Sequence, residues 1–161
     1  MKDIVLIDTS VLLNILDVPK RNQMRDEIDD ELGNLTQEET ELLLPMATIV
    51  ETGNFIVKIE DGNSRRELGE AFIETIRESY EGNAPWSPID FPDLKSVMPW
   101  LDEFPEYAMR GIGFADLSII KDWERMCRLN PRSRVRIWSL DKHLSGYDSK
   151  PGALPHPGAS L

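Results

Sequence analysis

The short apolar run at 4–7, IVLI, constrains the fold of this chain more than any other stretch. An unbroken run rich in β-branched residues is typical of a strand that is buried on both faces of a parallel sheet. Apolar side chains then recur at helical spacing through 11–16, and Thr9 or Ser10 can cap that helix. Asp8 therefore lies at the carboxyl end of a central strand, where open α/β sheets place their sites. An aspartate after a strand is also a common turn or capping residue, so Asp8 is informative only if other acids converge on it.

Beyond this first strand, the pattern alternates between strands and helices. Apolar runs predict strands at 41–45, 86–91 and 134–140, and helical spacing predicts helices at 20–41, 46–59, 65–80, 93–109 and 114–129. The first of these helices is expected to turn near Gly33, and the fourth to divide into two pieces at Pro99 and Pro105. Prolines in the second of these strands favour the edge of the sheet. The alternation predicts an α/β fold with a parallel sheet.

Length and composition favour one domain in a reducing compartment. A chain of 161 residues can bury a proper hydrophobic core. Its single cysteine, Cys127, excludes an internal disulfide. No apolar run is long enough to span a bilayer, and Asp3 and Asp8 interrupt the apolar segment that a secretory signal would need. We therefore expect a soluble, cytoplasmic protein that does not bind membranes.

Four acidic residues occupy positions that such a sheet brings together. Asp8 and Asp141 follow strands, whereas Glu51 and Asp116 lie near the beginnings of two helices. All four positions belong to the same edge of a parallel α/β sheet, and right-handed crossovers bring them around one crevice. Two of them also have simpler explanations: Glu51 can reach the surface, and Asp116 can interact favourably with the dipole of its helix.

Carboxylates gathered in this way would repel one another strongly unless hard cations bound between them. Oxygen ligands favour Mg²⁺ or Mn²⁺, and the chain lacks the Cys/His spacing that is typical of zinc sites. A pair of such ions can activate water and stabilise the leaving oxygen in phosphodiester hydrolysis. The pattern therefore predicts metal-dependent phosphodiester chemistry.

The four segments that carry these acids resemble, in order, the acidic motifs of PIN-domain ribonucleases: IVLIDTSVLLNIL, ATIVETGNF, GIGFADLSIIKDW and RIWSLDKHL. The resemblance implies a PIN-like nuclease domain at 1–147, followed by an irregular Pro/Gly-rich C-terminal tail at 148–161. It implies a three-layer α/β/α fold with a central, mostly parallel sheet of four to five strands. The chain departs from the family at His143, where members often have another acid, and no final edge strand is legible in 152–161.

By the same resemblance, Asp8, Glu51 and Asp116 form the core metal-binding triad and Asp141 is the fourth acid, all four being catalytic. Ser10 and Ser139 match supporting hydroxyl residues of the family. The function implied is a divalent-metal-dependent endoribonuclease that uses Mg²⁺ or Mn²⁺, either the toxin of a toxin–antitoxin pair, as in VapC-like proteins, or an RNA-processing enzyme. The partners implied are an RNA substrate, a protein antitoxin or other inhibitor, and a second copy in a homodimer.

Two other functions stay open. One is a catalytically silent PIN-like domain that binds protein or RNA, which the complete set of four acids argues against. The other is a phosphoacceptor signalling domain, although such domains usually carry adjacent acids after the first strand and here Thr9 follows Asp8. Magnesium-dependent loss of intact RNA would favour the nuclease.

Charge and hydropathy also vary along the chain. The net charge is −11, but 1–109 holds 24 acidic and nine basic residues whereas 110–161 holds five acidic and nine basic ones. We expect the basic residues around 125–142 to guide RNA, although a solvated helix end and strand edge explain them as well. The apolar residues in 93–109 predict either a contact surface for a partner or packing against 112–123.

Overall fold

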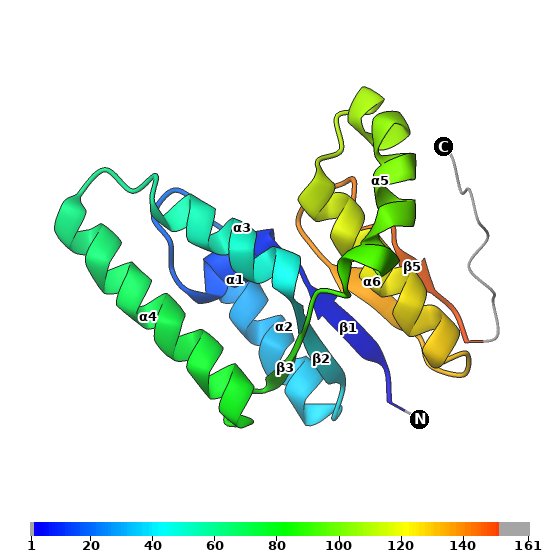
Figure 1. The fold of residues 1–161 in the computed structure, drawn as a ribbon. Coiled ribbons are helices and arrows are strands. Elements are labelled where there is room, and N and C mark those ends of the chain that lie inside the picture. Colours follow the sequence, from blue (N-terminus) through cyan, green and yellow to red (C-terminus); the bar gives the residue numbers. More distant parts are fainter. Residues whose placement is uncertain (1, 152–161) are drawn as a thin grey trace.

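A computed structural model describes residues 2–151 and has an α/β fold around one mixed sheet (Figure 1). The sheet has five strands in the order β3-β2-β1-β4-β5. Their bounds are Ile4–Ile7 for β1, Glu41–Pro45 for β2, Trp86–Ile89 for β3, Val135–Trp138 for β4 and Asp148–Ser149 for β5. The first four are parallel, and only β5 is antiparallel to its neighbour. The predicted fold class, with a mostly parallel central sheet, is confirmed.

Helices cover both faces of this sheet and complete a three-layer α/β/α arrangement (Figure 1). Their bounds are Thr9–Ile15 for α1, Arg25–Gln37 for α2, Met46–Ile56 for α3, Gly62–Glu81 for α4, Leu94–Met109 for α5 and Phe114–Leu129 for α6. No helix within 2–151 is both long and apolar enough to cross a membrane.

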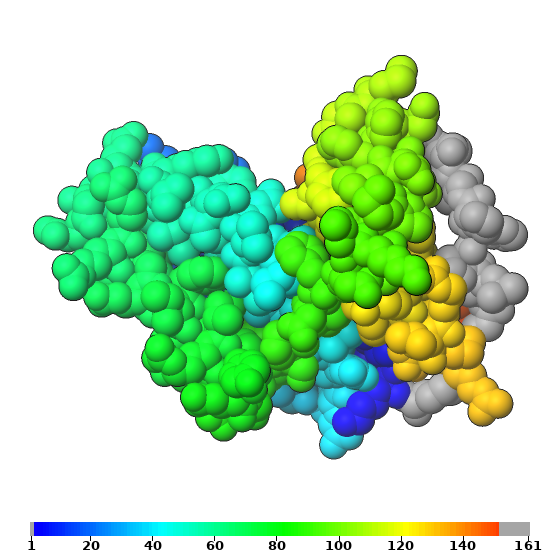
Figure 2. Space-filling view, in the orientation of Figure 1, coloured from blue at the N-terminus to red at the C-terminus, as the bar shows by residue number. Residues whose placement is uncertain are grey.

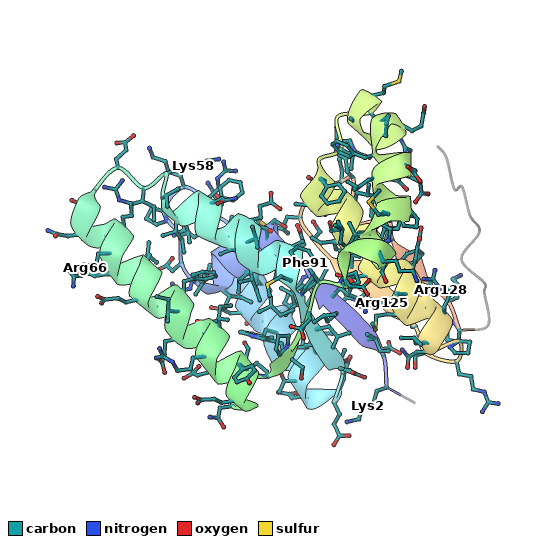
Figure 3. All side chains as sticks on the ribbon, viewed as in Figure 1. Lys2, Lys58, Arg66, Phe91, Arg125 and Arg128 are labelled. Atoms are coloured by element: carbon teal, nitrogen blue, oxygen red, sulfur yellow. The ribbon has the colours of Figure 1, made fainter. Side chains whose placement is uncertain are left out.

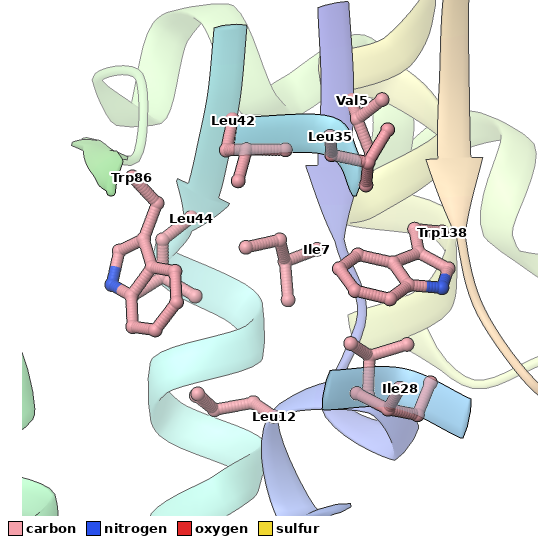
Figure 4. Close-up of a cluster of buried hydrophobic side chains, with 10 residues drawn as sticks. Val5, Ile7, Leu12, Ile28, Leu35, Leu42, Leu44, Trp86 and Trp138 are labelled. Carbon is pink, nitrogen blue, oxygen red and sulfur yellow. The ribbon is translucent and has the colours of Figure 1, made fainter. Parts of the chain in front are cut away.

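Strand β1 is buried on both sides, as its unbroken apolar run predicts. Val5 and Ile7 point to one face, where they pack with residues of α1 and α2 (Figure 4). Ile4 and Leu6 point to the other face, against residues of α6. The alternation of successive side chains along a strand produces these two core layers. A central position for β1 follows, with β2 on one side and β4 on the other.

Two predicted interruptions of helices are wrong. Helix α2 continues through Gly33, and α5 is a single helix that contains both Pro99 and Pro105. A proline inside a helix removes one backbone hydrogen bond, which tertiary contacts can offset. In α5, the ring of Phe104 meets that of Phe114 edge-on at 5.5 Å between centroids. Packing on α6 therefore holds α5 together despite its prolines.

The last edge strand lies earlier than expected. Residues Asp148 and Ser149, which we assigned to the irregular tail, form β5 beside β4. The guanidinium of Arg134 donates to both carboxylate oxygens of Asp148, at 2.8 and 2.6 Å. Side-chain contacts across the strand pair thus stabilise a strand that has little apolar pattern of its own. The remainder of the predicted tail, 152–161, lies outside the described residues.

Candidate functional site

All four predicted acids line one pocket of about 450 Å³. Asp8 follows β1 and Asp141 follows β4, while Glu51 lies on α3 and Asp116 in the first turn of α6. The pocket opens where the strand order reverses: the chain passes from β1 to β2 and β3 on one side, then returns to β4 on the other. This is the switch point at which open α/β sheets bind ligands. Figure 2 shows a hollow between the part of the molecule that contains α3 and the part that contains α5 and the beginning of α6.

Asp8 is held firmly through one of its two carboxylate oxygens. The residue is 4% exposed, and its side chain caps α1 by accepting from the backbone N–H of Ser10 at 3.3 Å. The hydroxyls of Ser10 and Ser139 donate to the same Oδ2 atom at 2.8 and 2.7 Å. Every hydrogen bond to this carboxylate from residues 2–151 ends on Oδ2, which leaves Oδ1 available to a ligand. The predicted cap, Thr9 or Ser10, is wrong because Asp8 itself takes that place.

The two serines also join the end of β1 to the loop after β4. Ser10 Oγ accepts from the backbone N–H of Leu140 at 3.0 Å, and Ser139 Oγ accepts from that of Asp141 at 2.9 Å. Asp141 in turn accepts from the backbone N–H of His143 at 2.8 Å. Each hydroxyl thus accepts from this loop and donates to Asp8, so one network sets the positions of two of the four acids.

Glu51 faces the pocket from α3 and is half-buried there. Its Oε2 accepts from the hydroxyl of Thr9 at 3.2 Å. Burial raises the pKa of Glu51 first of all, and the negative charge of Asp8 raises it further. The surface position that the sequence left open for Glu51 is not the one observed, because its carboxylate lines the same pocket as Asp8.

Asp116 interacts electrostatically with the three other acids. Burial raises the pKa of Asp116 to about 6, with further contributions from the charges of Asp8, Glu51 and Asp141. A carboxyl in the first turn of a helix would otherwise be stabilised as the anion by the helix dipole. The pKa of Asp116 is raised instead, because burial, reinforced by the neighbouring negative charges, outweighs the dipole here.

This donor set fits a divalent cation by charge and atom type. The four acids supply only oxygen atoms, which hard ions such as Mg²⁺ and Mn²⁺ prefer, and a cation would relieve the repulsion among them. Within 2–151, however, no three Asp, Glu, His or Cys side chains are close enough as they stand to hold a metal ion. The acids are therefore gathered around one pocket but are not drawn together into a finished coordination shell.

Three arginines of the predicted basic patch form ion pairs. Arg125 pairs with Asp122 at 3.0 Å, Arg134 with Asp148 at 2.6 Å and Arg136 with Glu31 at 2.8 Å. Figure 3 shows Arg125 and Arg128 on α6, on the opposite side of the molecule from Lys58 beyond α3. These pairings reduce the charge that the patch can offer to a phosphate backbone.

The pocket also contains residues that the sequence analysis missed. Lys20, Arg21 and Phe55 contribute to its wall next to the acids. Lys20 and Arg21 follow the break at Pro19, and Phe55 lies one helical turn beyond Glu51. Helical spacing could have placed Phe55 beside Glu51, but no local signal brings the 17–24 loop to the same pocket.

Comparison of the chain with models of known protein families finds no match, and comparison with curated proteins finds none either.

Proposed function

We propose that the acidic pocket is the active site of a divalent-metal-dependent endoribonuclease of the PIN type, which hydrolyses RNA phosphodiester bonds. One observation carries the proposal: four carboxylates from four separate segments line a single pocket at the switch point of the sheet. Repulsion among carboxylates gathered in this way destabilises the folded protein unless a cation binds between them, and such clusters are typical of functional sites. Asp8, Glu51, Asp116 and Asp141 would hold Mg²⁺ or Mn²⁺.

Each side chain has a defined part in this proposal. A metal ion held by the four acids would supply an activated water and stabilise the leaving oxygen. Ser10 and Ser139 hold the Oδ2 atom of Asp8 and so orient Oδ1 for binding. Thr9 holds Glu51 through its hydroxyl. Residues fixed by such hydrogen bonds keep a site in its productive geometry.

The direct test measures cleavage of RNA with Mg²⁺ or Mn²⁺ by the natural protein and by Asp8→Asn. The amide keeps the size of the side chain and one oxygen that can cap α1, but it removes the charge. We expect Asp8→Asn to slow cleavage by about 100-fold or more, the scale of losing one electrostatic stabiliser of the reaction. Asp26→Asn, on the exposed side of α2, is the matched control and should cleave normally. Equal cleavage by the natural protein and Asp8→Asn would contradict the proposal.

A second candidate function is a catalytically silent PIN-like domain that binds RNA or protein. The observation that favours it is the lack, within 2–151, of three acids close enough to hold a metal ion as they stand. Such a domain would bind RNA without cleaving it, whichever of the two ions is added. The cleavage assay and an RNA-binding assay on the same preparation distinguish the two functions.

The proposed physiological setting is the cytoplasm, where the protein would act as the toxin of a toxin–antitoxin pair or as an RNA-processing enzyme. We propose a homodimer formed through α5, on which Leu94, Met98, Leu101 and Met109 are exposed. Exposed apolar patches of this kind mark contact surfaces on many proteins. An antitoxin or other inhibitor would act by covering the acidic pocket.

A further inference from the structure

A second pocket, of about 410 Å³, lies directly beside the acidic one. Lys20, Arg21 and Phe55 belong to the walls of both pockets, whereas Lys58 lines only the second one. The shared residues make the two hollows neighbouring parts of one surface. An extended ligand could therefore occupy both.

Positive side chains gather around an aromatic ring at this junction. The guanidinium carbon of Arg21 lies 4.7 Å from the ring centroid of Phe55, and Lys58 Nζ lies 4.5 Å from the same centroid. Cation–π contacts of this length favour the observed positions of both cations. Phe55 thus holds two positive groups beside the acids without neutralising either.

These cations are only weakly paired with acids. Lys20 forms an exposed ion pair with Glu60 at 3.6 Å, which in water contributes little. Asp61 also lines the second pocket, but its carboxylate accepts from the backbone N–H of Ser64 and caps α4. Among the ion pairs formed by residues 2–151, none involves Arg21 or Lys58.

The loop that carries Lys20 and Arg21 is fixed to the acidic site. The buried amide of Asn14 donates to the carbonyl of Ser10 at 2.8 Å and accepts from the backbone N–H of Met24 at 3.0 Å. Lys20 has a φ of +66°, a conformation that a residue other than glycine keeps only where its surroundings enforce it. The loop is therefore held in place before any ligand arrives.

We propose that Lys20, Arg21 and Lys58 form a phosphate-binding subsite that holds the RNA backbone beside the acidic pocket. The inference rests on the proposed function for the identity of the polyanion. A chain with a net charge of −11 and a pocket lined by acids repels RNA, so cations next to that pocket are needed to bring a phosphate group to it. The basic residues around 125–142 line neither pocket, and three of them are paired with acids, so they do not supply this charge at the acidic site.

The test measures fluorescence anisotropy of a labelled single-stranded RNA in EDTA, so that the strand stays intact. The natural protein is compared with the double variant Arg21→Gln/Lys58→Gln over a range of salt concentrations. Loss of two phosphate contacts should weaken binding at low salt by on the order of tenfold and reduce the slope of log affinity against log salt by about 1.4.

The matched control is Arg128→Gln/Arg132→Gln, which removes the same charge from exposed positions near the end of α6. We expect it to change affinity and slope only slightly. A swapped variant, Arg21→Lys/Lys58→Arg, keeps the charge and should retain binding, which separates lost contacts from a disturbed loop.

Each outcome bears on one proposal or the other. Unchanged RNA binding by Arg21→Gln/Lys58→Gln, an equal loss in the control, or no RNA binding by the natural protein overturns the subsite. If the natural protein binds RNA through these cations but cleaves none with Mg²⁺ or Mn²⁺, the nuclease proposal fails and the subsite stands. Cleavage that depends on Asp8, with unchanged binding by the double variant, leaves the nuclease and removes the subsite.

Discussion

Two aspartates on α6 have raised pKa values, with burial as the main cause in both but with neighbours whose charges are opposite in sign. Burial raises the pKa of Asp122 to about 6, against the opposing effect of Arg125. Burial together with three neighbouring carboxylates raises the pKa of Asp116 to the same range. Asp122 forms a buried ion pair with Arg125, whereas Asp116 belongs to the candidate metal site. The two therefore form a natural pair for comparison.

The raised pKa of Asp116 predicts how stability depends on pH. The folded protein binds this proton more tightly than the unfolded chain, whose pKa is near 3.8. The contribution of Asp116 to the free energy of unfolding is therefore complete below about pH 4 and is lost as the pH rises through about 6. In EDTA, Asp116→Asn should raise the free energy of unfolding at neutral pH by roughly 1 kcal/mol, after allowing for solvent screening of a half-exposed group.

Urea denaturation of both proteins between pH 4 and 7.5 measures this effect. Asp116→Asn should show a flatter fall in stability across the interval. If both proteins lose stability in parallel, the buried negative charge of Asp116 does not destabilise the fold.

Helix α5 lies on the outside of the molecule and divides its apolar residues between two roles. Phe104 and Tyr107 pack toward α6, Phe104 against Phe114 and Tyr107 within a core cluster. Met98 and Leu101 remain 48% and 40% exposed. Some of the apolar side chains of α5 thus pack inward and others do not. The exposed ones are available to contact a second copy of the chain.

We expect Met98→Glu to separate the proposed dimer into folded monomers. A charge in an apolar contact is costly, whereas the same change on an exposed helix surface alters the free energy of unfolding by no more than about 0.5 kcal/mol. Sedimentation of the natural protein and the variant measures the change. Met98 is a cleaner choice than Trp100, which is partly buried, so that a charge there could unfold the helix. A natural protein that sediments as a monomer at high concentration would remove the dimer.

Metal binding should stabilise the domain as a whole. The four acids come from segments between Asp8 and Asp141, so that only the folded chain brings them together. A ligand that binds the folded state alone, at 100 times its dissociation constant, contributes about 2.7 kcal/mol. For a domain of this size Mn²⁺ should then raise the melting temperature by roughly 5 to 10 °C.

A thermal melt with and without Mn²⁺ checks this expectation. Asp116→Asn should lose most of the shift, and Asp122→Asn, on the same helix but outside the pocket, should retain it. An equal rise in all three proteins would show that Asp116 does not bind the ion.

Much of the architecture could be read from local patterns. The apolar run at 4–7 predicted a doubly buried strand, and the structure places it in the centre of the sheet. Helical spacing predicted α6 at its observed bounds. The positions of Asp8 and Asp116, after a strand and in a first helical turn, followed from the same local signals, since burial periodicity and helix starts depend on residues that are close in sequence.

Long-range packing decided the rest. Only the pairing of β4 with β1 brings Ser139 to within 2.7 Å of Asp8, 131 positions away. Only tertiary contacts neutralise the arginines near β4, keep α5 continuous and bring Arg21 onto the ring of Phe55. Partners so distant along the chain leave no periodicity in the sequence, because the free energy that joins them comes from surfaces that exist only once the sheet has formed. Local pattern thus determined which acids could converge, and the folded structure determined which hydroxyls and cations meet them.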